Sequence, residues 1–355
     1  MKEDNKNITK LIEETYALVF KKNYTYDKDT LDYSIGLLEK DLNKLGIKDF
    51  KELNNYTALN VGTGSESIAL ANLGAKRTYH LDVSNVAVDS LKEYIKDNNI
   101  TNISSNLFDL CSNEEMNFID EKCELIYLNG VLQHLYNPSN AMRNVYNSMK
   151  KDGRIFIRTY RNESWLFFMV ALLRTIFKYS DVRDLLECCI RRADNKDIYS
   201  DLFVCEMFDD IFVPVINIYS YFDLKKFFEN IGFEEIKIGG QKITEDGIPY
   251  LETEDTEESI MIGLRKKEDN IISEEIQFPK PINQLENFKD NSEIQKLLAE
   301  WKKLENKLEE DTNFRTQVPD IIYDLYHYTS FRRERNNDLN VLINEVTNYI
   351  AKINK

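Results

Sequence analysis

The stretch that decides the fold is "ALNVGTGSESIALANLGAKRTYHLDVS", from Ala58 to Ser84. An apolar run ends in a glycine-rich turn, a helical segment follows, and a second apolar run ends at Asp82. At Gly62 and Gly64 the missing Cβ lets the backbone pass close to a ligand. The helix that begins there offers free N–H groups, and Asp82 can accept hydrogen bonds from ribose hydroxyls. The pattern predicts an adenosine-containing ligand at the carboxyl edge of a parallel sheet.

The rest of the chain supports such a sheet, because apolar strand segments alternate with helical segments from about residue 56 to 160. Two of the strands are "CELIYLNGV" and "GRIFIRTY", with the helical segment "NPSNAMRNVYNSMK" between them. A helix–strand unit, "YSYFDLKKFFENIGFEEIKI", and a last strand at 259–265 complete the pattern. We therefore predict an α/β fold with a Rossmann-like, doubly wound, seven-stranded and mostly parallel sheet.

Changes in composition predict the domain organisation. We expect an N-terminal helical cap at 1–50 and a ligand-binding domain at 51–268, with a helical lid inserted at 162–218. A charged, proline-bearing linker at 269–290 leads to a C-terminal helical region at 291–355. Apolar residues recur there at helical spacing: Ile294, Leu297, Leu298, Trp301, Leu304 and Leu308. These helices either pack on the chain's own elements or form a homodimer interface.

Composition also limits the classes of partner. The net charge of -15 argues against broad binding to nucleic acid or anionic membranes. The five cysteines form no C-x-x-C pair, and the N-terminus is too polar for a signal peptide, so we expect a cytoplasmic protein. The run "WLFFMVALL" is too short to span a membrane. Three scattered histidines predict no metal site.

Four motifs, in this order, carry a family resemblance: "LNVGTGSESIALANLGAK", "TYHLDVS", "NLFDL" and "CELIYLNGVLQHLYNPSNAMRNVYNSMKKDGRIFIRTYR". The chain resembles the class I S-adenosylmethionine-dependent methyltransferases over about residues 25–265. The fourth motif is similar to the ubiquinone/menaquinone-type superfamily and its relatives in surface-sugar and natural-product pathways. The resemblance implies S-adenosylmethionine as cofactor, with Asp82 at the ribose and Asp109 at the adenine amino group. The cofactor-binding residues that it implies are Asn60, Gly62, Thr63, Gly64, Asp82, Val83, Asp109, Leu110 and Asn129.

Two residues depart from the family pattern. Asn60 stands where an acidic residue is usual before the turn, and Glu66 stands where a third glycine is usual. Glu66 either supplies a negative charge near the cofactor's ammonium group or points to solvent. From the sequence, we favour solvent.

Methyl transfer is an in-line displacement, so the protein's main task is to position the acceptor and exclude water. His134 is the best candidate for a base, and the alternative is that it forms a wall of the cofactor pocket. Substrate contacts are predicted after the strand ends, at Arg158, Tyr160, Arg161 and Tyr219. Residues 143–192 hold eleven basic and five acidic residues, 11 − 5 = +6. This excess indicates either solvated helix faces or an anionic acceptor under the lid.

We therefore predict methyl transfer to a small or medium-sized metabolite, such as an anionic sugar or a natural-product intermediate. One alternative is a methyltransferase that acts on a protein, peptide or RNA docked by the C-terminal helices. A nicotinamide-dependent oxidoreductase is disfavoured because Ser67 replaces the third glycine of its G-x-G-x-x-G turn. The last alternative is a catalytically inactive binding protein.

Overall fold

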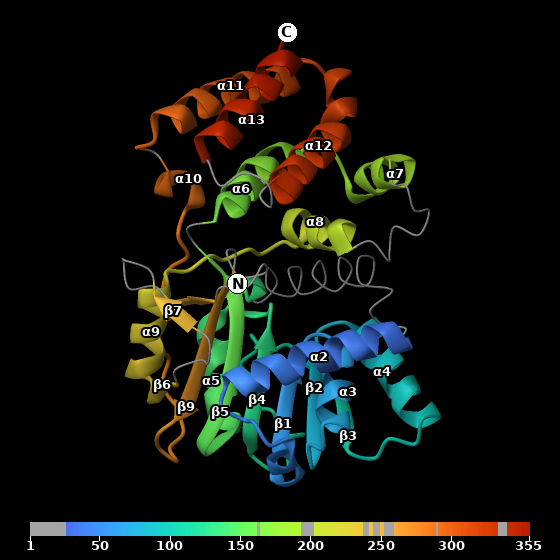
Figure 1. Ribbon diagram of the computed structural model, residues 1–355, viewed down its shortest axis with the longest axis vertical. Coiled ribbons are helices and arrows are strands. Elements are labelled where there is room, and N and C mark those ends of the chain that lie inside the picture. The colour runs from blue at the N-terminus through green and yellow to red at the C-terminus, as the bar shows by residue number, and fades with distance from the viewer. Residues whose placement is uncertain are drawn as a thin grey trace. The chain divides into compact units, whose positions relative to one another are not determined.

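The computed structural model describes residues 26–161, 164–192, 202–236, 241–243, 249–251, 259–288, 290–332 and 339–355. The chain forms two compact units (Figure 1). Unit 1 comprises the residues up to Arg161 together with Val213–Pro281, and unit 2 comprises Asn162–Phe212 together with Ile282–Lys355. The inserted segment that the sequence predicted as a lid therefore shares a unit with the C-terminal helices.

Unit 1 contains a seven-stranded sheet with the order β3-β2-β1-β4-β5-β9-β6. Strand β9 runs antiparallel to both of its neighbours, and the other paired strands run parallel. This confirms the predicted Rossmann-like, mostly parallel fold. The strands are β1 (Thr57–Val61), β2 (Arg77–Asp82), β3 (Ile103–Leu107), β4 (Cys123–Asn129), β5 (Met149–Tyr160), β6 (Phe233–Ile236) and β9 (Ser259–Lys266). A separate antiparallel pair is formed by β7 (Gln241–Ile243) and β8 (Pro249–Leu251).

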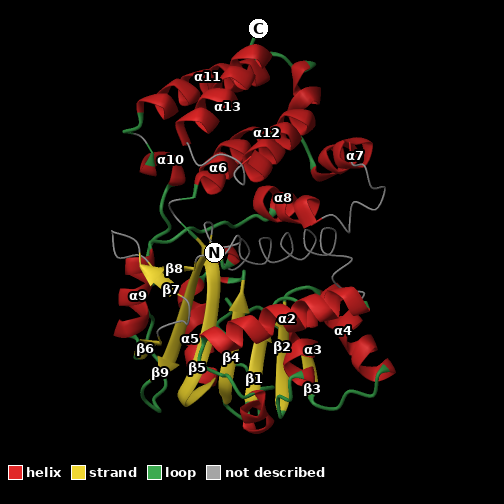
Figure 2. Cartoon of the chain, in the orientation of Figure 1, coloured by secondary structure: helices red, strands yellow, loops and turns green. Residues whose placement is uncertain are grey.

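Helices cover both faces of the sheet (Figure 2). They are α2 (Lys28–Lys44), α3 (Gly64–Asn72), α4 (Asn85–Asp97), α5 (Pro138–Ser148) and α9 (Tyr221–Asn230). At the N-termini of α2, α4 and α5, a capping side chain accepts a hydrogen bond from a free backbone N–H group. Asp27 accepts from the Thr30 amide at 2.8 Å, and Asn137 caps α5 directly before a proline at its first position.

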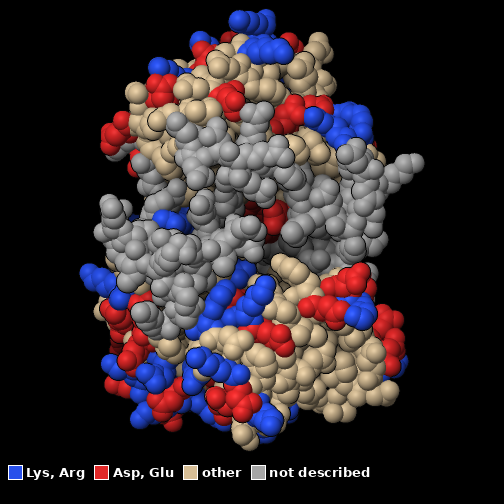
Figure 3. All heavy atoms as spheres, in the orientation of Figure 1, with Lys and Arg blue, Asp and Glu red and all other residues tan. Residues whose placement is uncertain are grey.

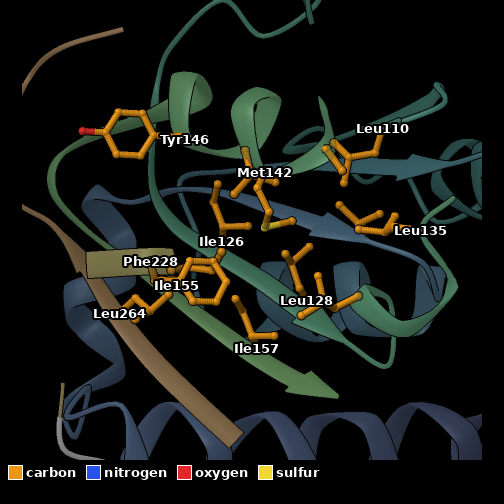
Figure 4. Close-up of a cluster of buried hydrophobic side chains, with 14 of the residues drawn as sticks. Leu110, Ile126, Leu128, Leu135, Met142, Tyr146, Ile155, Ile157, Phe228 and Leu264 are labelled. Atoms are coloured by element: carbon orange, nitrogen blue, oxygen red, sulfur yellow. The ribbon is translucent and has the colours of Figure 1, made fainter. Parts of the chain in front are cut away.

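The alternation of side chains along the central strands builds two cores. Leu125 and Tyr127 of β4 pack with α2 and α3 on one face of the sheet. Ile126 and Leu128 point to the other face and pack with α5 and α9 (Figure 4). Both faces of these strands are therefore apolar, which is typical of a parallel sheet covered by helices on both sides.

The first part of the predicted linker is packed on unit 1. Phe278 is buried, and the centroid of its ring lies 4.4 Å from the ring centroid of Phe227 and 5.1 Å from that of Tyr219. The backbone of Ile272 exchanges hydrogen bonds with the Asn147 side chain of α5 at 2.8 and 3.0 Å. An apolar anchor and paired backbone contacts thus hold residues 269–281 against the sheet domain.

Unit 2 is helical and has its own core. Helix α12 packs on α6 and α7, and α11 packs on α13. The predicted apolar stripe of α11 is buried except for Leu298, which is half-buried, and the indole of Trp301 donates to the Thr175 hydroxyl at 3.0 Å. The helices are α6 (Trp165–Phe177), α7 (Val182–Arg192), α8 (Leu202–Phe212), α10 (Gln284–Asn287), α11 (Ser292–Glu310), α12 (Val318–Arg332) and α13 (Leu339–Ile353). Within the described ranges, no helix combines the length and the apolar character that crossing a bilayer requires.

Phe278 gives a direct test of the docked segment. Phe278→Ala should lower the free energy of unfolding of unit 1 by about 3 kcal/mol, because it removes a buried ring and leaves a cavity. Urea unfolding followed by circular dichroism measures the loss. Ile271→Ala is the matched control, because Ile271 lies in the same segment and is 66% exposed. Equal effects of the two substitutions would show that Phe278 does not anchor the segment.

Candidate functional site

The site is positioned by the central pair of parallel strands. Strands β1 and β4 lie side by side, with Asn60 paired to Tyr127, and each strand is followed by a helix. The helix after β1 (α3) covers one face of the sheet, and the helix after β4 (α5) covers the other. The connections therefore diverge between these two carboxyl ends, which is where open α/β sheets bind ligands. The turn after β1 and Asn129 at the end of β4 both lie at this edge.

The turn at Gly62 is held by the neighbouring strand β2. The Gly62 amide donates to the Leu81 carbonyl at 2.9 Å, and the Gly62 carbonyl lies 2.7 Å from Nε2 of His80. Burial lowers the pKa of His80 to about 4, so the ring is neutral at physiological pH. Because a carbonyl can only accept, the single ring proton is on Nε2, and Nδ1 accepts from the Ser105 hydroxyl at 2.9 Å. Gly62 itself has φ +107°, a conformation that favours glycine.

Glu66 is buried, so the prediction that it points to solvent is wrong. Its side chain is in the first turn of α3 and is 5% exposed, and Oε1 accepts from Nδ2 of Asn129 at 2.7 Å. Asn60 lies beside the same turn, where its Nδ2 donates to the Thr63 carbonyl at 2.8 Å and to Ser67 Oγ at 3.0 Å. The structure thus brings together Asn60, Thr63 and Asn129, as the sequence predicted, and adds Glu66 to them.

Ionisable side chains of α2, α3 and β5 form a cluster next to this edge of the sheet. Burial raises the pKa of Glu66 to about 7, although hydrogen bonding from Asn129 and Thr63 and the charge of Arg158 oppose that rise. Arg158 lies 3.4 Å from the buried carboxylate of Asp41, a residue of α2. The Tyr127 hydroxyl also donates to Asp41, at 2.8 Å. Arg158, predicted to contact substrate, is therefore already engaged with Asp41.

The two aspartates predicted to contact the adenosine lie at the ends of β2 and just beyond β3. Asp82 Oδ1 accepts from the Ser84 amide at 2.7 Å, and Val83 lies half-buried between these two residues. Asp109 accepts from the Cys111 amide at 2.9 Å and from the Tyr136 hydroxyl. The Tyr136 contact to Asp109 was not predicted.

Leu110 differs from its predicted neighbours in the site. Its side chain is buried in the core, and its carbonyl accepts from the Asn144 side chain at 3.0 Å. Its side chain is therefore part of the core of unit 1.

His134 lies in a short 3₁₀ turn, η3 (Leu132–His134), after β4. Its Nδ1 is 3.0 Å from the Val215 carbonyl and must therefore donate in the neutral ring, which makes Nε2 the basic nitrogen. The ring meets that of Tyr160 edge to face, with centroids 5.8 Å apart.

The other predicted substrate residues lie beyond β5. Arg161 forms an isolated parallel bridge with Tyr219. Tyr219 is fully buried in the core against Phe278, where burial raises the pKa of its hydroxyl. Its side chain is thus part of the core of unit 1.

Several of the basic residues at 143–192 are engaged in ion pairs or bind carbonyls. Lys150 pairs with Glu124, and Arg174 donates to the carbonyls of Asp210 and Ile211, each at 3.1 Å. Further contacts of this kind are made by Arg158, Lys178, Arg191 and Arg192. On the face seen in Figure 3, Lys and Arg side chains lie among Asp and Glu side chains. The local excess of positive charge therefore does not form a separate anion site among these residues.

Tyr26 is a site-edge residue that the sequence did not reveal. It is buried, its ring packs on Tyr94 at 5.2 Å, and a Cβ added at Gly64 would collide with its hydroxyl. Gly64 is therefore needed to accommodate Tyr26, whatever else the turn holds. Tyr26 lies far from the turn in sequence and has no periodic partner, so no local signal predicts this contact.

Comparison with protein-family models identifies one domain in part of the chain. The family model "Methyltransferase domain" matches residues 53–203, less than half of the chain. No curated protein matches significantly.

Many solved structures resemble the chain, and the three described here are 12–14% identical to it. The magnesium protoporphyrin IX methyltransferase of Synechocystis PCC 6803 is 12% identical, with a TM-score of 0.41 and coverage of 73% of this chain and 97% of that one. The YcgJ protein of Bacillus subtilis is 12% identical, with a TM-score of 0.40 and coverage of 67% and 99%. The N-methyltransferase NodS of Bradyrhizobium japonicum WM9 is 14% identical, with a TM-score of 0.35 and coverage of 67% and 96%.

Burial of Glu66 predicts a pH dependence of stability. Because its pKa is raised in the folded protein to about 7, its contribution is fully present below its unfolded pKa of 4.5 and is lost as pH rises through about 7. In the unaltered chain, Glu66 should make the unfolding free energy fall with rising pH, by at most about 1.4 kcal/mol per pH unit between pH 5 and 7. Glu66→Gln should abolish this part of the pH dependence. Urea unfolding at pH 5, 6, 7 and 8 measures it. Glu93→Gln, at an exposed position of α4, should leave the slope unchanged. A Glu66→Gln slope identical to that of the unaltered chain would contradict the prediction.

Proposed function

We propose that the chain binds S-adenosylmethionine at the carboxyl ends of β1, β2 and β4 and transfers its methyl group to a small or medium-sized metabolite. The observation that carries the proposal is the turn at Gly62–Gly64 beside Asp82, within a segment that matches the methyltransferase-domain model. When bound, the cofactor supplies an electrophilic methyl group on a sulfonium centre. The chain's own residues bind and orient it.

The residues present fit this cofactor. Asp82 takes the ribose hydroxyls, and Asp109, oriented by Tyr136, takes the adenine amino group. The buried Oδ1 of Asn60 and Oε2 of Glu66 lack hydrogen-bond partners of normal geometry among the described residues. Both are acceptors, so they fit a ligand that carries N–H donors. A pyrophosphate in the same turn would meet the Glu66 carboxylate instead of a positive group, which argues against a dinucleotide.

His134 is the residue that we propose as the base for an acceptor that must lose a proton. Its Nδ1–H is fixed on the Val215 carbonyl, so Nε2 is the nitrogen that takes the proton. Tyr160 holds the ring from its edge. An acceptor that carries no such proton needs only positioning against the methyl group.

A macromolecular acceptor is the second candidate. The observation that favours it is that the C-terminal helices belong to a unit with its own core, which is a feature of docking modules. The net charge of -15 argues against RNA as the acceptor, because RNA is itself negatively charged. We keep the small metabolite as the proposed acceptor, and an anionic acceptor is not required, since several of the basic residues expected to hold it are engaged elsewhere.

One experiment separates the two acceptors. Cell extract is divided into low-mass and macromolecular fractions and incubated with the protein and cofactor carrying an isotopically labelled methyl group. Label in the low-mass fraction, with the mass gain of one methyl group, supports the proposal. Label found only in the macromolecular fraction would replace it with the second candidate.

Asp82 tests the cofactor site. Asp82→Ala should weaken binding of S-adenosylmethionine by about 1–3 kcal/mol, because it removes charge-assisted hydrogen bonds to the ribose. Isothermal titration calorimetry measures the affinity. Asp89→Ala, at an exposed position of α4, should bind as the unaltered chain does. Unchanged affinity of Asp82→Ala would remove Asp82 from the ribose role.

His134 tests the chemistry. His134→Asn keeps a side-chain N–H for the Val215 carbonyl but has no basic nitrogen, so turnover should fall about 100-fold or more with cofactor affinity unchanged. The turnover of His134→Ala should fall at least as far. Steady-state kinetics on the acceptor identified above give the comparison. If His134→Asn keeps nearly full turnover, His134 is a wall of the site and not its base.

A further inference from the structure

The first turn of α3 contains the buried carboxyl group of Glu66. Glu66 is 5% exposed, Oε1 accepts from Asn129, and Oε2 has no partner of normal geometry among the described residues. Buried polar atoms in folded proteins are nearly always hydrogen-bonded, so an orphaned oxygen at a ligand-binding edge indicates a missing donor.

A second orphaned acceptor lies beside the same turn. Asn60 is fully buried, and its Nδ2 donates to the Thr63 carbonyl and to Ser67 Oγ, while its Oδ1 has no partner among the described residues. This part of the structure therefore holds two buried acceptor atoms at the turn for which the described residues supply no donor of normal geometry. A ligand group that donates several hydrogen bonds satisfies both, whereas a group that only accepts satisfies neither.

The charges around Glu66 favour a cationic donor. The groups that face it are Thr63 at the start of its own helix, Asn129 and Tyr127 of β4, Arg158 of β5 and Asp41 of α2. Arg158 is the one cation among them, and its guanidinium lies against Asp41 at 3.4 Å. Because Arg158 is paired with Asp41, none of these described groups supplies a cation that is dedicated to the Glu66 carboxylate.

We propose that Glu66 is the carboxylate that binds the primary ammonium group of the cofactor's amino-acid portion, and that it releases a proton when this ammonium enters. The inference rests on the proposed function. In the ligand-free protein the carboxyl O–H carries the proton. On binding, that proton passes to solvent, and the resulting carboxylate accepts N–H bonds from the ammonium. Burial, which raises the pKa of Glu66 to about 7, is what keeps the free carboxyl protonated in weakly acidic solution.

The test uses the full chain and two probes that differ only in the group concerned. S-Adenosylhomocysteine carries the ammonium, and 5′-methylthioadenosine keeps the adenosine and the sulfur but lacks the amino-acid portion. Calorimetry at pH 6 and pH 8, in buffers of different ionisation enthalpy, gives both the affinity and the number of protons released.

For the unaltered chain we expect more protons released with S-adenosylhomocysteine at pH 6 than at pH 8. Glu66→Gln should bind this probe about 10-fold or more weakly at pH 8 and lose that difference in proton release. Both proteins should bind 5′-methylthioadenosine equally, which also shows that the variant keeps a folded adenosine site.

The outcomes separate the two claims. If the unaltered chain binds neither probe, the proposed function fails, and this inference fails with it. If Glu66→Gln binds S-adenosylhomocysteine as tightly as the unaltered chain, with the same proton release, the role of Glu66 is refuted while the cofactor assignment stands. If the variant loses affinity for both probes equally, Glu66 supports the turn and does not bind the ammonium.

Discussion

The peptide at Gly62 is held from both sides by strand β2, and the rest of the site depends on this arrangement. Its amide donates to Leu81, and its carbonyl accepts from the neutral ring of His80. Because the amide and the carbonyl of Gly62 are both hydrogen-bonded, the path of the backbone after β1 is fixed, and α3 begins two residues after Gly62. That fixes where the first-turn side chains of α3 lie. It also explains a buried histidine in a sheet strand: apolar side chains fill the same space but cannot donate to the carbonyl.

The three carboxylates at this edge of the sheet differ in their hydrogen-bond partners. Asp41 is fully buried and accepts from Tyr127 and Arg158, so it ties α2 to β4 and β5. Asp109 is oriented by Tyr136, and Glu66 shares one oxygen with Asn129. The Asp41 carboxylate is structural because its hydrogen-bond and ion-pair partners both belong to the chain itself. Glu66 has an oxygen left over, and this difference in hydrogen bonding is the physical reason to assign a ligand to it.

The fold was predictable because strand and helix periods alternate, and the sheet order follows from known rules of connection. The proximity of Asn60, Gly62, Asp82 and Asn129 was predictable because each lies at or next to the carboxyl end of a parallel strand. The burial of Glu66 was not, because a single acidic residue in a helix gives no sign of which face it occupies. Nor was Tyr26 against Gly64, or Asp41 against Arg158, since each pair joins residues far apart in sequence. Docking of 269–281 was missed because its charges indicate a linker, while one aromatic anchor, Phe278, decides its packing.

The grouping of 162–212 with the C-terminal helices follows from the composition of α6. This helix is apolar around most of its circumference, with buried residues on every side, so it cannot form one face of a solvent-exposed insertion. It needs α12 against it, and Trp301 of α11 reaches Thr175 on α6. Removing residues 282–355 would therefore expose the apolar surface of α6 as well as delete the C-terminal helices. Most of the apolar stripe of α11 is likewise buried within the unit. Acceptor recognition is thus best probed by point substitutions in an intact chain, because here the two segments are one folding unit.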